Sequence, residues 1–174
     1  MYNRILVVVD DRAVSRTAVK EGISLARVTG AELLFFTVLP RYVIPVADVP
    51  PIALDSPVEF EREARARAER LLAGAQALAT RVHVPNGALI GSGDDDAECI
   101  AEMASREQCD AIVVASEGRN AVMRLLTGSV VPGLITASPV PVLVCKPRQK
   151  MPARATAVVT PLTGRAARKA APMQ

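Results

Sequence analysis

The sequence has few aromatic residues and one histidine. Of its 174 residues, 3% are Phe, Tyr or Trp, with no Trp at all, whereas 50% are hydrophobic. A core of this composition is built from Val, Leu, Ile and Ala, which favours an α/β domain over a β-sandwich. The length suffices for one domain with a substantial core and is too short for two ordinary domains.

Long apolar runs are also missing. No stretch reaches the roughly 18 apolar residues that a transmembrane helix needs, so no membrane span is expected. The strand-like pattern begins at Ile5, and no charged leader or apolar signal segment comes before it. These features predict a cytoplasmic protein.

Paired cysteines and metal-ligand spacings are absent. The three cysteines are Cys99, Cys109 and Cys145, and they form no CxxC pair, so we expect buried, reduced thiols. A metal site would need partners that the lone His83 does not supply. His83 itself lies in an alternating Val-His-Val segment and is expected on a strand face.

Acidic residues are missing from the C-terminal end. Residues 149–174 contain five Lys or Arg and no Asp or Glu. Residues 1–148 therefore contain 16 of the 21 basic residues and all 18 acidic ones. The main part of the chain is therefore slightly acidic, and nucleic acid is not an expected partner. The tail is rich in Ala, Pro and Arg with little periodicity. We predict one domain over 1–148 and a basic, disordered tail over 149–174.

What the sequence does contain is an alternation of strand-like and helix-like segments. Strands are expected within these ranges: Ile5–Val9, Leu33–Leu39, Val82–Ile90, Ala111–Ala115 and Val140–Cys145. Helical patterns separate them, and such alternation requires parallel strands joined by right-handed crossovers. The sequence therefore predicts an α/β fold with a five-stranded parallel sheet and helices on both faces. Ligands of such sheets bind beyond the carboxyl ends of the strands.

A loop with regularly placed glycines follows the fourth of these strands. Gly118 comes just after Ala111–Ala115, and Gly128-Ser129 comes just before the next helical segment. A Gly-Ser pair at a helix start offers free backbone N–H groups, a hydroxyl and the positive end of the helix dipole to an anion such as phosphate. Arg119 in the same loop could add a charge-assisted contact to phosphate. Glycines between a strand and a helix are also ordinary turn residues, so the spacing alone leaves both interpretations open.

This segment resembles the signature of the universal stress proteins, whose nucleotide-binding members carry Gly-x2-Gly-x9-Gly-Ser/Thr. Gly118, the nine residues after it, Gly128 and Ser129 match the last three elements, while Ala115 stands where the family has glycine. The opening segment Ile5–Asp11 and the closing PVPVLVCK also fall in the family order. The resemblance covers Met1 to about Arg148.

The resemblance implies a Rossmann-like sheet in the order 3-2-1-4-5 and a crevice that holds ATP, with or without Mg²⁺. It assigns Asp10 to the ribose or base and Val38 to the adenine. The loop residues Ala115, Gly118, Arg119, Gly128 and Ser129 are assigned to the rest of the nucleotide. It also implies a homodimer formed through the last strand, Val140–Cys145. From the residues alone, Asp10 or Asp11 reads equally well as a helix cap and Val38 as a core residue.

The expected function is that of a stress-response regulator that binds ATP or a related adenine nucleotide. No residue stands out as a nucleophile or general base, so no enzymatic activity is assigned, and slow ATP hydrolysis is left open. The alternative is a dimeric stress protein that binds no nucleotide and acts through protein–protein contacts. Ala115, Asp11 and Arg12 motivate this alternative, because all three depart from the family pattern around the pocket. A phosphoacceptor receiver domain is rejected, because Ile90 runs into Gly91-Ser92 with no carboxylate to phosphorylate.

Two charged segments are interpreted as structural. In the long helix expected over Val58–Thr80, the pairs Glu61/Arg65 and Glu63/Arg67 have the spacing of exposed helix ion pairs, which predicts a solvated face and no binding surface. The three carboxylates Asp94–Asp96 precede a helical pattern and are predicted to cap it.

Overall fold

The structure, a computed structural model, describes residues 2–42, 56–116 and 130–147. The predictions for Gly118, Arg119, Gly128, Ser129 and the tail 149–174 lie outside the described residues. None of the helices in the described part of the chain combines the length and apolar character needed to cross a membrane.

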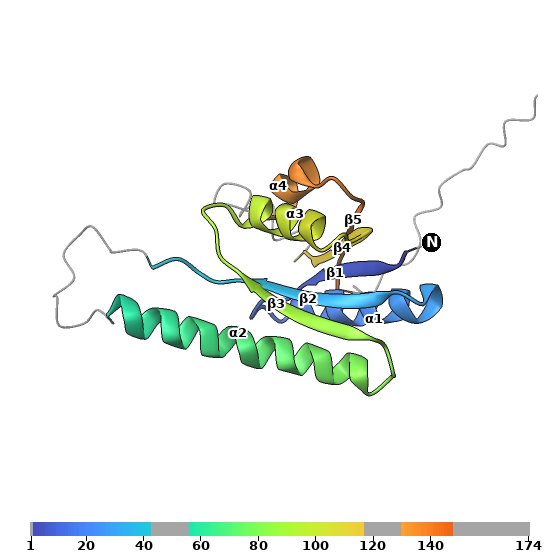
Figure 1. Ribbon diagram of the computed structural model, residues 1–174, viewed down its shortest axis with the longest axis horizontal. Coiled ribbons are helices and arrows are strands. Elements are labelled where there is room, and N and C mark those ends of the chain that lie inside the picture. Colours follow the sequence, from blue (N-terminus) through green and yellow to red (C-terminus); the bar gives the residue numbers. More distant parts are fainter. Residues whose placement is uncertain (1, 43–55, 117–129, 148–174) are drawn as a thin grey trace, which may run out of the picture.

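The described strands form one parallel sheet (Figure 1). The strands are β1 (Arg4–Val8), β2 (Glu32–Val38), β3 (Asn86–Gly91), β4 (Ala111–Ala115) and β5 (Val142–Cys145). Their order is β3-β2-β1-β4-β5, which confirms the predicted topology. β5 lies at an edge, as expected for a strand preceded by Pro141, whose missing N–H cannot donate to a ladder.

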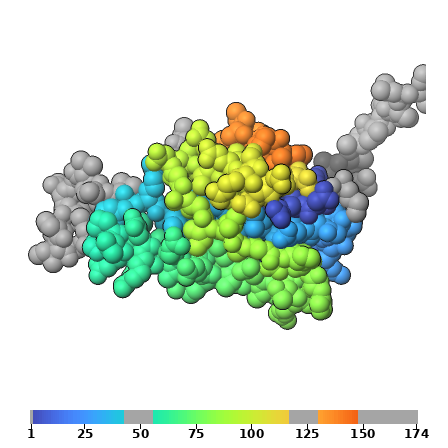
Figure 2. Space-filling view, in the orientation of Figure 1, coloured from blue at the N-terminus to red at the C-terminus, as the bar shows by residue number. Residues whose placement is uncertain are grey.

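Helices cover both faces of the sheet (Figure 1). They are α1 (Ser15–Thr29), α2 (Pro57–Thr80), α3 (Asp96–Arg106) and α4 (Val130–Ala137). α1 and α2 lie on one face, and α3 and α4 lie on the other. In the space-filling view, α4 and α3 form the upper part of the molecule and α2 runs along its lower side (Figure 2).

The central strands are buried on both faces, which divides the core into two clusters. In β1, Ile5 and Val7 pack against α1 and α2, whereas Leu6 and Val8 pack against α3 and α4. Because side chains of a strand alternate between faces, the continuous apolar run of β1 serves both layers at once. Each face of the sheet therefore has its own layer of apolar contacts with the helices.

Local signals in the sequence set the helix ends. Gly30 ends α1 in the left-handed conformation, with φ of 76°, and its N–H donates to the carbonyl of Ala26. Asp95 caps α3 by accepting from the N–H groups of Ala97 at 2.7 Å and Glu98 at 3.0 Å, which confirms the capping role predicted for this acidic run.

Two further helix ends differ from expectation. Ser56 and Glu59 form a reciprocal capping box at the start of α2, which the sequence interpretation did not identify. The cap predicted for α1 from Asp10 or Asp11 is wrong. The N-cap residue of α1 is Val14, which makes no side-chain capping hydrogen bond, so neither carboxylate caps the helix.

The prediction that His83 lies on a strand face is wrong. His83 is exposed and follows α2 in the left-handed conformation, with φ of 58°. Its N–H donates to the carbonyl of Thr80, and the N–H of Val84 donates to that of Ala79, which together form a Schellman ending with histidine in the place of the usual glycine. Val84 is buried as the hydrophobic contact of that ending. Strand β3 therefore begins only at Asn86.

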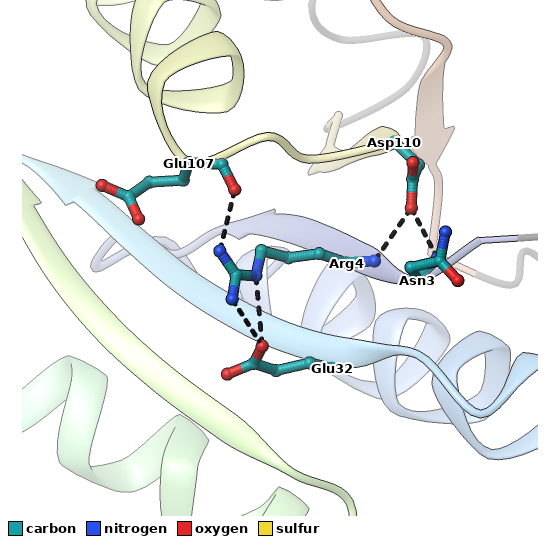
Figure 3. Close-up of polar contacts among 5 residues, drawn as sticks. All are labelled: Asn3, Arg4, Glu32, Glu107 and Asp110. Carbon is teal, nitrogen blue, oxygen red and sulfur yellow. Dashed lines mark hydrogen bonds and ion pairs between the residues drawn. The ribbon is translucent and has the colours of Figure 1, made fainter.

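A polar network fastens the amino ends of three strands (Figure 3). The Arg4 guanidinium donates to the Glu32 carboxylate at 2.9 and 3.1 Å and to the backbone carbonyl of Glu107 at 2.9 Å. The Asp110 carboxylate accepts from the backbone N–H groups of Asn3 at 2.5 Å and Arg4 at 2.9 Å. These contacts join β1 to β2 and to the turn before β4, at the edge opposite the strands' carboxyl ends.

Candidate functional site

The carboxyl ends of the strands meet at one edge of the sheet, and the direction of winding reverses there. The helix after β1 covers one face, whereas the helix between β4 and β5 covers the other. Because β1 and β4 are neighbours, the two connections leave a crevice beyond their ends. In doubly wound sheets this is the edge where a ligand site is expected.

A cavity of about 360 Å³ opens at this edge, between the ends of β1 and β2 and the amino-terminal half of α2. The segments that follow β1 and β2, the facing side of α2 and the start of α3 all contribute residues. The lining consists of Asp10, Asp11, Thr37, Val38, Pro40, Phe60, Glu63, Ala64, Arg67, Ala68, Leu71 and Asp96.

Two of the predicted site residues come together at this cavity. Val8 of β1 pairs with Phe36 of β2. Asp10 comes two residues after Val8, and Val38 comes two residues after Phe36. Both side chains line the cavity. The parallel register thus brings a carboxylate and an apolar side chain together from segments that are distant in the sequence.

The Asp10 carboxylate is held by Arg12. Its Oδ1 accepts from the backbone N–H of Arg12 at 3.0 Å, and its Oδ2 accepts from Arg12 Nε at 2.8 Å and also from Nη2. The backbone N–H of Asp10 donates to the hydroxyl of Ser15 at 3.0 Å, and Ser15 is only 3% exposed. The segment between β1 and α1 is therefore fixed at both the carboxylate and the backbone of Asp10.

The opposite wall of the cavity belongs to α2 and is largely apolar. Phe60, Ala64, Ala68 and Leu71 lie at helical spacing on the face of α2 that turns toward the sheet. Phe60 also contacts Tyr42 edge-on, with ring centroids 5.3 Å apart, which links the segment after β2 to α2. Val38 of β2 and this stripe of α2 therefore both give the cavity apolar surface.

The charged side of α2, interpreted from the sequence as a solvated face with no binding surface, reaches the cavity. Glu63 and Arg67 both line the cavity at the edge of the apolar stripe. The stripe beginning at Phe60 was the signal available in the sequence, and it identifies the buried side of α2. It could not show that the sheet ends there and leaves a space, because that depends on where the strands stop.

The charge of the lining is predominantly acidic. Asp10, Asp11, Glu63 and Asp96 contribute four carboxylates, and Arg67 contributes one cation. Carboxylates accept hydrogen bonds and donate none when ionised, so this lining suits hydroxyl and amino groups and disfavours an anion. Within the described ranges, no three His, Cys, Asp or Glu side chains are grouped so as to bind a metal ion.

Ala115 ends β4 next to the crevice but does not line the cavity. Its side chain is 2% exposed and packs in the cluster on the α1 side of the sheet, and its backbone does not adopt a positive φ. Alanine is therefore accommodated without strain where the family signature has glycine. The next residue, Ser116, donates its N–H to the carbonyl of Cys145 at 2.8 Å.

The three thiols are free and lie away from the cavity lining. Cys109 and Cys145 are buried and Cys99 is half-buried. Burial raises the pKa of all three, that of Cys109 to about 11. Thiols of raised pKa are poor nucleophiles, which agrees with their predicted structural role.

Together these features define a doubly wound α/β protein with a cavity at the carboxyl ends of β1 and β2. The model of the universal stress protein family matches residues 1–146. The chain belongs to this family.

Known relatives agree with this assignment. A protein of Staphylococcus haemolyticus named as a universal stress protein is 27% identical over 146 residues, which is 83% of this chain and 85% of that protein. The universal stress protein UspA of Lactobacillus plantarum superposes with a TM-score of 0.66 at 23% identity, covering 83% of this chain and 97% of its own. A family protein of Arabidopsis thaliana, solved with AMP bound, superposes with a TM-score of 0.59 at 19% identity, covering 84% and 92%. Other family members were solved with dAMP and with cAMP.

Proposed function

We propose that this universal stress protein binds an adenine nucleotide at the carboxyl ends of β1, β2 and β4 and acts as a cytoplasmic, nucleotide-responsive regulator of the stress response. The observation that carries the proposal is the meeting of Asp10 and Val38 on one cavity whose far wall is the apolar stripe of α2. The family members solved with AMP, dAMP and cAMP support the same class of ligand.

Each wall of the cavity suits a different part of the nucleotide. Val38 from β2 and Phe60 from α2 offer apolar surface to the base. Asp10 offers carboxylate oxygens to ribose hydroxyls. The acidic lining makes this the nucleoside end, so phosphates belong beyond it. We assign them to Gly118, Arg119, Gly128 and Ser129, next to Ala115, with ATP, with or without Mg²⁺, as the proposed physiological nucleotide.

Titration calorimetry tests the proposal. We expect AMP and ATP to bind the purified full chain with one site, and Val38→Trp to abolish binding by filling the space for the base. Leu78→Trp is the control, because it adds the same side chain at a residue that is 42% exposed, near the far end of α2 and outside the cavity lining. Equal heats for both variants, or no heat from the unmodified chain, would contradict the proposal.

We further propose that the protein is a homodimer through β5. This strand lies at the sheet edge with its outer ladder groups unpaired within the described part of the chain, and Leu143 on it is 46% exposed. Exposed edge strands favour strand addition by a second copy. The sheet would then be continuous across the dimer, with the two nucleotide sites independent of the contact.

A further inference from the structure

A groove runs between α3 and α4 on the outer surface of the molecule. The two helices pack side by side on the same face of the sheet (Figure 1). Two hollows of about 460 and 400 Å³ lie along their junction, and both are lined by Glu98 and Ala137, so they form one groove. Neither hollow shares a residue with the lining of the cavity at the ends of β1 and β2. The groove is therefore separate from the cavity that is proposed to hold the nucleotide.

The α3 side of the groove is acidic. Asp95, Glu98 and Glu102 line it, and none of the described Lys or Arg residues does. Glu98 and Glu102 are both exposed and lie four residues apart on the helix, a spacing at which two like charges repel each other. Neither of them forms an ion pair with another residue that the structure describes. A cationic occupant of the groove would relieve this repulsion.

The α4 side of the groove is apolar and uncovered. α4 has the sequence VVPGLITA, which contains no charged residue, and only Leu134 of this helix is buried. Pro132, Gly133 and Ala137 line the groove and are all exposed. A helix that is apolar on all sides is normally buried on all sides, so this one lacks a cover. The groove as a whole therefore suits a chain segment that carries both cationic and apolar side chains.

The chain itself continues into such a segment. The described residues end at Pro147, just after β5, and β5 contacts α4. Residues 149–174 contain five Lys or Arg, no Asp or Glu, and apolar residues that are mostly Ala and Val. The stretch from Pro147 to Arg165 spans up to about 60 Å when it is extended. Since the 11-residue helix α3 is about 16 Å long, the cations of this segment can reach the whole groove.

We propose that the groove between α3 and α4 is the docking surface for the chain's own basic segment, residues 149–174. Lys and Arg side chains of the segment pair with Glu98 and Glu102, and its apolar residues cover the exposed side of α4. A segment held in this way needs no regular secondary structure, which agrees with the lack of periodicity in its sequence. While the segment is docked, the groove is closed to other basic partners.

Carbodiimide cross-linking of the full chain tests where the segment lies, because this reagent joins a lysine amine to a carboxylate only when the two are in contact. The segment has two lysines, Lys150 and Lys169. Peptide mapping of the monomeric product should find them joined to Glu98 or Glu102, and 1 M salt should suppress these links because it screens exposed charges. Links found only in a dimeric product would mean that the groove holds the segment of a second copy. Links spread equally over the exposed carboxylates of α2 would mean that the segment is not docked. Either result overturns the proposal.

Limited proteolysis with trypsin, which cuts after Lys and Arg, measures how firmly the segment is held. The variant Glu98→Gln/Glu102→Gln should be cut within residues 149–174 about 2- to 10-fold faster than the unmodified protein, because two exposed ion pairs are lost. The control Glu61→Gln/Glu69→Gln makes the same change in net charge on α2, which lies on the opposite face of the sheet, and should be cut at the unmodified rate. Equal rates for the two variants would contradict the proposed ion pairs. Both variants should bind nucleotide as the unmodified protein does, so this proposal and the proposed function can fail independently.

Discussion

The packing of α1 on β1 leads to a sharp prediction at Gly22. This glycine is buried in α1, and a Cβ built on it would lie 2.7 Å from Cγ2 of Val7, a distance that real Cβ atoms do not show. Val7 is β-branched and fully buried, so its methyl group has little freedom to move away. Gly74 in α2 provides the comparison, because a Cβ there would meet no atom within 4 Å.

The magnitudes can be worked out for the two positions. Replacing glycine by alanine inside a helix stabilises it by about 1 kcal/mol, and this applies to both sites. At Gly22 the added methyl group also overpacks the core, which costs about 1–3 kcal/mol. We therefore expect Gly74→Ala to raise the free energy of unfolding by up to about 1 kcal/mol. We expect Gly22→Ala to lower it by up to about 2 kcal/mol, a difference between the variants of about 1–3 kcal/mol.

Urea unfolding at 25 °C, followed by circular dichroism, measures both variants under the same conditions. In a double-mutant cycle, Gly22→Ala and Val7→Ala together should destabilise less than the sum of their separate effects, with a coupling energy of about 0.5–3 kcal/mol. If Gly22→Ala stabilises the protein as much as Gly74→Ala does, the close approach of α1 to β1 is wrong.

Three further predictions concern other parts of the molecule. Hydrogen bonds from the backbone N–H groups of Arg4 and Asn3 lower the pKa of Asp110 from its ordinary 3.8, so its contribution to stability is present above that value and is lost as pH falls through the lowered pKa. Asp110→Asn should therefore be less stable than the unmodified protein at pH 7, with the gap closing in acid, as thermal unfolding across pH will show. Cys109, with a pKa raised to about 11 by burial, should resist alkylation in the folded protein and react only on unfolding, measured by mass spectrometry. Leu143→Lys places a charge on the exposed edge of β5 and should convert the proposed dimer to a monomer in light scattering; an unchanged mass would place the interface elsewhere.

The sequence was most informative where burial on both faces dictates composition. Ala111–Ala115 was predicted with the bounds that β4 has in the structure, because a short, continuous apolar run admits few alternatives once flanking turns are present. His83 was misplaced because Val-His-Val alternates as a strand does. Its actual conformation is set by the hydrogen bonds that close the end of α2. Because histidine adopts the left-handed region less readily than glycine, the residue type at this position did not indicate a helix end.

The site was predictable only in part, for a related reason. Asp10 and Val38 were assigned by the resemblance to the family, and the fold brings them together because the ends of parallel strands share an edge. The α2 wall at Phe60 was not identified, because its position depends on the tertiary arrangement. The contact between Asp10 and Arg12 joins residues two apart, a spacing at which side chains do not face each other on a helix, and it forms because the chain turns between β1 and α1.

The most direct test of nucleotide binding is to ask what the protein carries when it is purified without added nucleotide. The full chain would be denatured and the released small molecules separated by chromatography, with Gly128→Trp as the comparison. The account predicts an adenine nucleotide at a substantial fraction of one per chain from the unmodified protein and none from the variant. An empty unmodified protein that also gives no calorimetric signal with ATP and Mg²⁺ would contradict the account. It would favour instead a dimeric stress protein that works without nucleotide.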